Sequence, residues 1–197
     1  KDMKIPLLYI LVRPLLKLWF YFTYYPTYIN RESIPKKGRV ILAGTHTNNL
    51  DGFLLASATI RPVRFIAKKE LFKGIGKWFF TSCGMIPVDR SVHDKTVIPA
   101  AINLLEKEAV IGIFPEGTIN RTDEIIMPFK KGAIKMAIST KSPIVPFAII
   151  GDYQKFKKNV KIVFGNLYYP QTIDIEKENK ILEDKVKNLI KEGRETK

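Results

Sequence analysis

The 197-residue chain is expected to fold as an α/β domain with a mostly parallel sheet flanked by helices. Two patterns predict this class. Short apolar runs of strand character alternate along the chain with longer segments whose apolar residues recur at helical spacing. Polar or charged residues then follow directly after several of the apolar runs, where sheets of this kind usually carry their functional sites.

The chain opens with a strongly apolar and aromatic segment, residues 5–29. Pro14 and Pro26 are expected to kink or end a helix within it. No uncharged stretch reaches the roughly 18 residues of a membrane-spanning helix. The density of tyrosine and tryptophan favours the membrane interface instead. We therefore interpret residues 1–30 as a membrane-interface helical segment, the alternative being a pair of core helices in a soluble protein.

A polar connection at residues 30–38 leads into the α/β domain, residues 39–197. We expect strands at residues 39–43, 63–67, 85–88, 110–114, 144–150 and 160–164. We expect helices at residues 50–59, 75–83, 96–108, 132–140 and 177–191. The strand at 144–150 carries Pro146, which is unusual inside a sheet.

The formal net charge of +14 requires an anionic partner. Nucleic acid, an anionic membrane surface and acidic protein substrates are the candidates, and charge alone does not choose among them. One cysteine, Cys83, and two histidines exclude zinc-finger spacing and provide no convincing ligand set for a metal. We therefore expect no metal site and no internal disulfide.

His46 follows the apolar run 40–43 and a glycine, and Asp51 comes five residues later, at the start of a helical pattern. Five residues is about 500° around a helix, so the two side chains would not share a helical face. They can meet if His46 lies in the turn and Asp51 in the first helical turn. The chemistry expected of such a pair is a neutral imidazole base held in one tautomer by a carboxylate. The alternative is a capped helix with an incidental histidine.

Two further strand ends carry polar or charged residues, at 68–90 and 114–121. Because the carboxyl ends of parallel strands converge, all three clusters could line one crevice. The chain has no Gly-x-Ser-x-Gly elbow, so a histidine–carboxylate pair makes sense if the substrate brings the hydroxyl. Lys69, Arg90 and Arg121 would then hold an anion. The alternative for each is a solvated surface charge.

These motifs resemble, in order, the four blocks of the glycerolipid acyltransferases of the lysophosphatidic acid acyltransferase type. His46 and Asp51 match the H-x-x-x-x-D block. The other three correspond to residues 68–71 with 84–90, to 114–118 with Arg121, and to 144–146 with Gly151. Together the blocks cover about residues 40–151.

The resemblance implies transfer of a fatty acyl group from an acyl thioester to lysophosphatidic acid, giving phosphatidic acid. The thioester, of coenzyme A or of acyl carrier protein, would be a co-substrate and no other cofactor is expected. His46 would be the general base, oriented by Asp51. The implied substrate-binding residues are Lys69 and Arg90 for phosphate, Glu116, Gly117 and Thr118 for the glycerol part, and Arg121 as a further anion contact.

In members of the resembled family an amino-terminal helical pair anchors the enzyme on the membrane, so we expect association with an anionic membrane surface, at the cytoplasmic face of the cell membrane. The apolar, aromatic amino terminus and the three strand-end polar clusters speak against a nucleic-acid partner. Three positions depart from the family pattern: Thr45 stands for asparagine, Asn48 for serine and Ile119 for arginine. These departures leave glycerol 3-phosphate or another lysolipid open as the acceptor. From other classes, a basic nucleic-acid-binding domain and an inactive lipid-binding scaffold remain as alternatives. His93 and Asp94 are interpreted as polar loop residues rather than as a second pair.

Overall fold

The structure, a computed structural model, describes residues 7–74, 77, 81, 84–89 and 96–195. The strands are β1 (Thr27–Ile29), β2 (Val40–Gly44), β3 (Val63–Lys68), β4 (Ile86–Val88), β5 (Val110–Ile113), β6 (Ile144–Ile150) and β7 (Lys161–Phe164). The helices are α1 (Leu7–Tyr24), α2 (Asp51–Ala58), α4 (Val97–Glu106), α5 (Gly132–Thr140) and α6 (Ile175–Glu195), with 3-10 turns η1 (Arg31–Ser33) and η2 (Lys69–Phe72).

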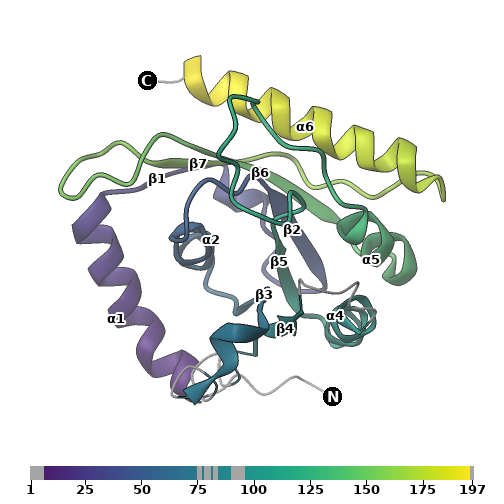
Figure 1. Cartoon of the computed structure of the whole chain (residues 1–197), viewed down its shortest axis with the longest axis horizontal. Coiled ribbons are helices and arrows are strands. Elements are labelled where there is room, and N and C mark those ends of the chain that lie inside the picture. Colours follow the sequence, from purple (N-terminus) through teal and green to yellow (C-terminus); the bar gives the residue numbers. More distant parts are fainter. Residues whose placement is uncertain (1–6, 75–76, 78–80, 82–83, 90–95, 196–197) are drawn as a thin grey trace.

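These strands form one seven-stranded sheet in the order β1-β7-β6-β2-β5-β3-β4 (Figure 1). Every neighbouring pair is parallel except β6 and β7, which are antiparallel. The expected α/β class with a mostly parallel sheet is therefore confirmed. The helix expected at residues 75–83 falls largely outside the described residues.

One strand was not expected from the sequence. Thr27–Ile29 lies within the segment interpreted as helical, but it forms β1 and pairs in parallel with β7. α1 ends at Tyr24 because Tyr25 adopts a left-handed conformation (φ 43°) and Pro26 cannot continue the helix. The helix itself is confirmed and passes through Pro14 without ending there.

Helices cover both faces of the sheet, and the alternation of side chains along β2 divides the core between them. Ile41 and Ala43 point to one face, where they join the apolar residues of α4, α5 and α6. Val40 and Leu42 point to the other, where they join those of α1 and α2. Because all of β2 is buried, its carboxyl end is a rigid platform in the middle of the sheet.

Only part of α1 packs on the sheet. Phe20 and Tyr24 are buried in the core, whereas much of the remaining helix surface is apolar and exposed. Among the side chains of α1 that the structure describes, the large exposed ones are Leu11, Leu15, Leu18, Trp19, Tyr21 and Phe22. Within the residues that the structure describes, none of the helices combines the length and apolar character needed to traverse a bilayer.

Candidate active site

The site begins where β2 ends, at Gly44. A side chain at this position would collide with the backbone carbonyl of Phe147 on β6, so only glycine lets the two strands approach this closely. The next residue, Thr45, is buried and its Oγ1 accepts a hydrogen bond from the Ile149 N–H at 2.9 Å. The end of β2 is thus held against β6 at two consecutive residues, Gly44 and Thr45, directly before the chain turns out of the sheet.

His46 lies in this turn and Asp51 in the first turn of α2, as the spacing requires. Asp51 Oδ2 lies 2.9 Å from His46 Nδ1 and accepts the backbone N–H groups of Thr47 at 2.6 Å and Asn48 at 2.8 Å. The Asp51 residue is fully buried, whereas the His46 side chain is 15% exposed. The carboxylate is therefore fixed inside the protein while one edge of the imidazole faces outward.

The second carboxylate oxygen of Asp51 has its own donor, which the sequence interpretation did not include. Tyr153, in the β6–β7 connection, donates its hydroxyl to Asp51 Oδ1 at 2.6 Å. Burial raises the pKa of Tyr153, and the nearby Asp51 charge raises it further. The phenol therefore stays protonated and remains a donor. Its position two residues after Gly151 of the fourth block is the only sequence signal that could have indicated it.

The imidazole of His46 is held from two further directions. Its ring stacks on Phe114, with the ring centroids 4.2 Å apart and the planes inclined by 16°. The backbone N–H of His46 donates to Glu116 Oε1 at 2.8 Å, and its carbonyl accepts the Asn120 N–H at 2.8 Å. With Nδ1–H directed at Asp51, Nε2 is the nitrogen with a free lone pair.

Glu116 is buried beneath this turn. Its other oxygen accepts the Met127 N–H at 2.9 Å, so both carboxylate oxygens are used by backbone donors. Burial raises the pKa of Glu116, and the two backbone N–H groups act in the opposite direction. Glu116 thus ties the loop after β5 to the turn after β2. Beyond it, Gly117 takes a left-handed conformation (φ 76°) and Thr118 is exposed.

The loop after β5 is also held from α6. Glu183 accepts the Phe129 N–H at 2.9 Å, and the Asn179 side-chain amide donates to the Phe129 carbonyl at the same distance. Phe129 lies two residues after Met127, which Glu116 holds. A chain of contacts therefore runs from α6 through this loop to His46.

The predicted anion-binding residues lie outside this closely bonded group. Lys69 follows β3, its side chain is 68% exposed, and its Nζ lies 3.9 Å from Asp89. Arg121 is exposed on the loop after β5. Arg90 falls outside the described residues. The structure therefore joins His46, Asp51 and Glu116 by hydrogen bonds, while Lys69 and Arg121 follow the same ends of neighbouring strands without bonding to that group.

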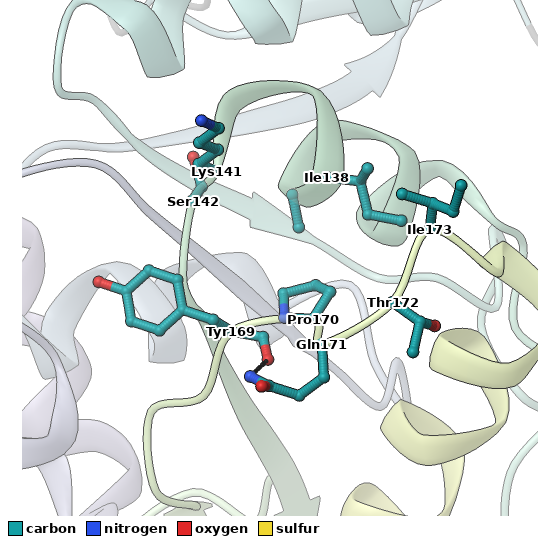
Figure 2. A pocket seen from close by; sticks show the side chains of 9 residues that line it. Ile138, Lys141, Ser142, Tyr169, Pro170, Gln171, Thr172 and Ile173 are labelled. Atoms are coloured by element: carbon teal, nitrogen blue, oxygen red, sulfur yellow. Dashed lines mark hydrogen bonds between the residues drawn. The ribbon is translucent and has the colours of Figure 1, made fainter.

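A shallow pocket of about 210 Å³ lies elsewhere, between α5 and residues 169–173 (Figure 2). Its wall includes Ser142, which precedes β6, so it lies at the amino ends of the strands, opposite His46. Across the described part of the chain, no three His, Cys, Asp or Glu residues gather as a metal ion would require. The turn after β2 is thus the place where this structure concentrates chemically active groups.

Comparison with known proteins gives a consistent set of similarities. A family model described as Acyltransferase matches residues 26–150. The chain is 35% identical over 144 residues to the 1-acyl-sn-glycerol-3-phosphate acyltransferase of Bacillus subtilis, an alignment that spans 69% of this chain and 70% of that protein. It is 31% identical over 142 residues to the human 1-acyl-sn-glycerol-3-phosphate acyltransferase alpha, spanning 66% of this chain and 48% of the relative.

The fold has a solved counterpart. The crystal structure of the 1-acyl-sn-glycerophosphate (LPA) acyltransferase PlsC from Thermotoga maritima superposes with a TM-score of 0.77 at 23% sequence identity. The match covers 94% of this chain and 81% of that one. At this identity the likeness concerns the fold.

Proposed function

The chain belongs to the acyltransferase family, and from this membership we propose that it transfers a fatty acyl group from an acyl thioester to the free hydroxyl of lysophosphatidic acid. The product would be phosphatidic acid. The observation that carries the proposal is the 2.9 Å contact between His46 Nδ1 and a fully buried Asp51, on a turn that leaves the other edge of the imidazole exposed.

The reaction needs one base and no nucleophile from the protein. His46 Nε2 takes the proton of the acceptor hydroxyl as its oxygen attacks the thioester carbonyl carbon. Asp51 keeps the Nδ1–H tautomer and stabilises the imidazolium that forms. The tetrahedral intermediate then collapses, the carbon–sulfur bond breaks, and the imidazolium proton passes to the leaving thiolate. The products are the acylated acceptor and a free thiol, and no cofactor beyond the thioester co-substrate is needed.

Acceptor binding is proposed to use the cationic side chains at the neighbouring strand ends. Lys69 and Arg121 are both exposed, so either can reach a phosphate in solvent. Arg90 is proposed for the same role from its sequence position alone. Gly117 and Thr118 are suited to contact the glycerol part of the acceptor. They directly follow Glu116, whose carboxylate accepts the backbone N–H of His46, so they lie close to the proposed base.

Membrane association is supported by α1. Its exposed leucine, tryptophan, tyrosine and phenylalanine side chains suit the boundary between headgroups and acyl chains. The net charge of +14 adds attraction to an anionic surface. We therefore propose that the enzyme works at the cytoplasmic face of a membrane.

A radiolabelled acyl-transfer screen tests the function. The purified full chain would be supplied with acyl-coenzyme A or acyl carrier protein thioesters and with lysophosphatidic acid, glycerol 3-phosphate or a neutral lysolipid. We expect lysophosphatidic acid to be acylated fastest. Faster acylation of glycerol 3-phosphate, or of a lysolipid without phosphate, would overturn the proposed acceptor.

The His46→Ala variant tests the mechanism in the same assay. Removal of a general base should lower turnover by about 10²-fold or more. The matched control is His93→Ala, which changes the only other histidine of the chain and should leave turnover near that of the wild type. Unchanged turnover in His46→Ala would contradict the mechanism.

A further inference from the structure

The connection between β6 and β7, residues 151–160, has an unusual surface. It carries three exposed lysines, Lys155, Lys157 and Lys158, against one acidic residue, Asp152. Between the lysines stands Phe156, whose side chain is 73% exposed. With most of its surface in solvent, this ring contributes little to packing within the protein.

The backbone fixes Phe156 in this exposed position. The residue adopts a left-handed conformation (φ 61°), and its N–H donates to the carbonyl of Thr23 on α1 at 2.6 Å. The loop is therefore bonded to the carboxyl end of α1, where Phe22 is also exposed. Figure 1 shows the connection projecting past β1, on the side of the molecule where α1 lies.

We propose that residues 154–158 form a membrane-binding loop for an anionic bilayer, in which Phe156 inserts at headgroup level and the three lysines contact anionic headgroups. An anionic bilayer is the partner that fits this loop. The ring suits the boundary between headgroups and acyl chains, and the flanking lysines complement the negative charge of the headgroups. This proposal rests on the proposed membrane function and adds a second contact, separate from the apolar face of α1.

Vesicle sedimentation tests the loop with the full chain. One set of vesicles contains equal parts of phosphatidylglycerol and phosphatidylcholine, and the other phosphatidylcholine alone. Phe156→Asn removes the ring while keeping a residue that tolerates φ > 0. Its matched control is Ile173→Asn, since Ile173 is 87% exposed near α5. We expect Phe156→Asn to lower the partition coefficient on anionic vesicles at least fivefold and the control to leave it unchanged.

The charge contribution needs a second comparison. Replacing Lys155, Lys157 and Lys158 with glutamine should reduce partitioning on anionic vesicles by about tenfold or more and have little effect on neutral ones. The matched control replaces three exposed lysines elsewhere, Lys36, Lys177 and Lys191, so that the net charge falls equally. Unchanged binding in the loop variants, or equal losses in the controls, would overturn the proposal.

Two measurements separate this proposal from the enzymatic one. His46→Ala should bind vesicles as the wild type does, so vesicle binding can be measured in a variant that has lost its turnover. Phe156→Asn should acylate detergent-dispersed acceptor at the wild-type rate. A wild-type chain that binds anionic vesicles through the loop but acylates no acceptor would contradict only the proposed function.

A different observation on the same connection carries a second inference. Tyr153 points inward, its hydroxyl 2.6 Å from Asp51 Oδ1, and its ring packs against Phe20 and Tyr24 of α1 with centroids 6.1 Å and 5.7 Å away. Both α1 residues are buried. α1 therefore contacts the residue whose hydroxyl binds Asp51 Oδ1.

We infer that Tyr153 is a positioning residue. Its hydroxyl orients the Asp51 carboxylate and disperses its charge, and Asp51 in turn controls how readily His46 takes up a proton. The groups facing His46 are Asp51 from α2 and Glu116 from the loop after β5, and Tyr153 acts on it only through Asp51. Without the phenol, the charge on Asp51 is less dispersed and attracts a proton on His46 more strongly.

Tyr153→Phe tests this inference because it removes one oxygen and keeps the ring. We expect kcat to fall about fivefold, the worth of one hydrogen bond, with little change in KM for the acceptor. The acidic limb of the kcat/KM profile should move to higher pH. The matched control is Tyr168→Phe, which removes a largely buried hydroxyl that has no hydrogen-bond partner among the residues described by the structure.

Only an effect on the reaction supports a positioning role. A Tyr153→Phe variant that loses thermal stability but keeps the wild-type kcat and acidic limb would overturn the inference. Equal kinetic changes in Tyr168→Phe would overturn it as well, since they would reflect general loosening of the sheet. If His46→Ala kept the wild-type turnover, that result would contradict the proposed mechanism and not the role of Tyr153.

Discussion

The two halves of the candidate site are built differently. Around His46 every group is fixed: Asp51 is fully buried, its oxygens accept four donors at 2.6–2.9 Å, and Glu116 is bonded twice to backbone. Lys69 and Arg121, by contrast, are exposed, and the ion pair between Lys69 and Asp89 is long at 3.9 Å. The groups proposed to transfer the proton are thus already in position without substrate. The exposed side chains proposed to bind the anion must instead become ordered when the substrate binds.

The largest expected effect beyond His46 itself comes from Asp51→Asn. An amide keeps one acceptor oxygen for the Thr47 and Asn48 N–H groups, but it places an NH2 where Asp51 Oδ1 accepts Tyr153, and being neutral it cannot stabilise an imidazolium as a carboxylate does. We expect a loss in kcat on the order of 10²- to 10³-fold with little change in KM. A kcat within a few fold of the wild type would show that the rigid half of the site is not the catalytic one.

Glu116→Gln should have an intermediate effect. The glutamine amide can accept only one of the two backbone N–H groups, so His46 or Met127 loses its partner. We expect kcat to fall roughly tenfold and the free energy of unfolding to fall by about 1–3 kcal/mol at neutral pH. Parallel denaturant titrations and turnover assays measure both.

The same variant has a pH signature. Because burial raises the pKa of Glu116 above its ordinary 4.5, the folded protein binds this proton more tightly than the unfolded chain. This stabilisation relative to Glu116→Gln is fully present below pH 4.5 and is lost as the pH rises through the raised pKa. Urea titrations at several pH values measure the difference, and a difference that grows with pH would contradict this burial argument.

Arg121→Ala and Lys69→Ala should act on binding. We expect KM for lysophosphatidic acid to rise about threefold to tenfold and kcat to stay near that of the wild type, because each exposed cation contributes modestly. The rise should shrink as salt is added. A neutral acceptor should be spared, and equal losses on both acceptors would contradict a phosphate role.

The smallest effect is expected from Thr118→Ala. Its side chain is exposed, so removal leaves no buried group without a partner. We expect KM for the acceptor to rise about twofold and stability to be unchanged, as is usual for surface substitutions. A loss in kcat comparable to that of Glu116→Gln would show that Thr118 acts with the fixed groups around His46 and not with the exposed residues proposed to bind the acceptor.

Local patterns were sufficient to predict most of the fold and the centre of the site. Apolar runs identified β2, β5 and β6, because strands buried on both faces have few polar positions, and they identified β3 although it contains Arg64. The spacing of His46 and Asp51 allowed only the turn that the structure contains. Both predictions depend on residues close together in the sequence.

The rest depends on contacts between distant segments. Tyr153 lies 102 residues from Asp51, and a tyrosine in a loop carries no signature of the partner it meets. Glu116 was predicted to face the acceptor, but its backbone partners become visible only when the loop after β5 is folded onto His46. β1 is three residues long and too short to show a period of its own.

The contacts between α6 and Phe129 have a consequence for how the enzyme is made. Glu183 is 54 residues beyond Phe129, so the loop that holds Glu116 acquires this support only once synthesis has reached the middle of α6. In a growing chain, the turn that carries His46 therefore emerges well before the last support of the loop beneath it. The candidate site would therefore be complete only when α6 has emerged, and not when the turn that carries His46 emerges.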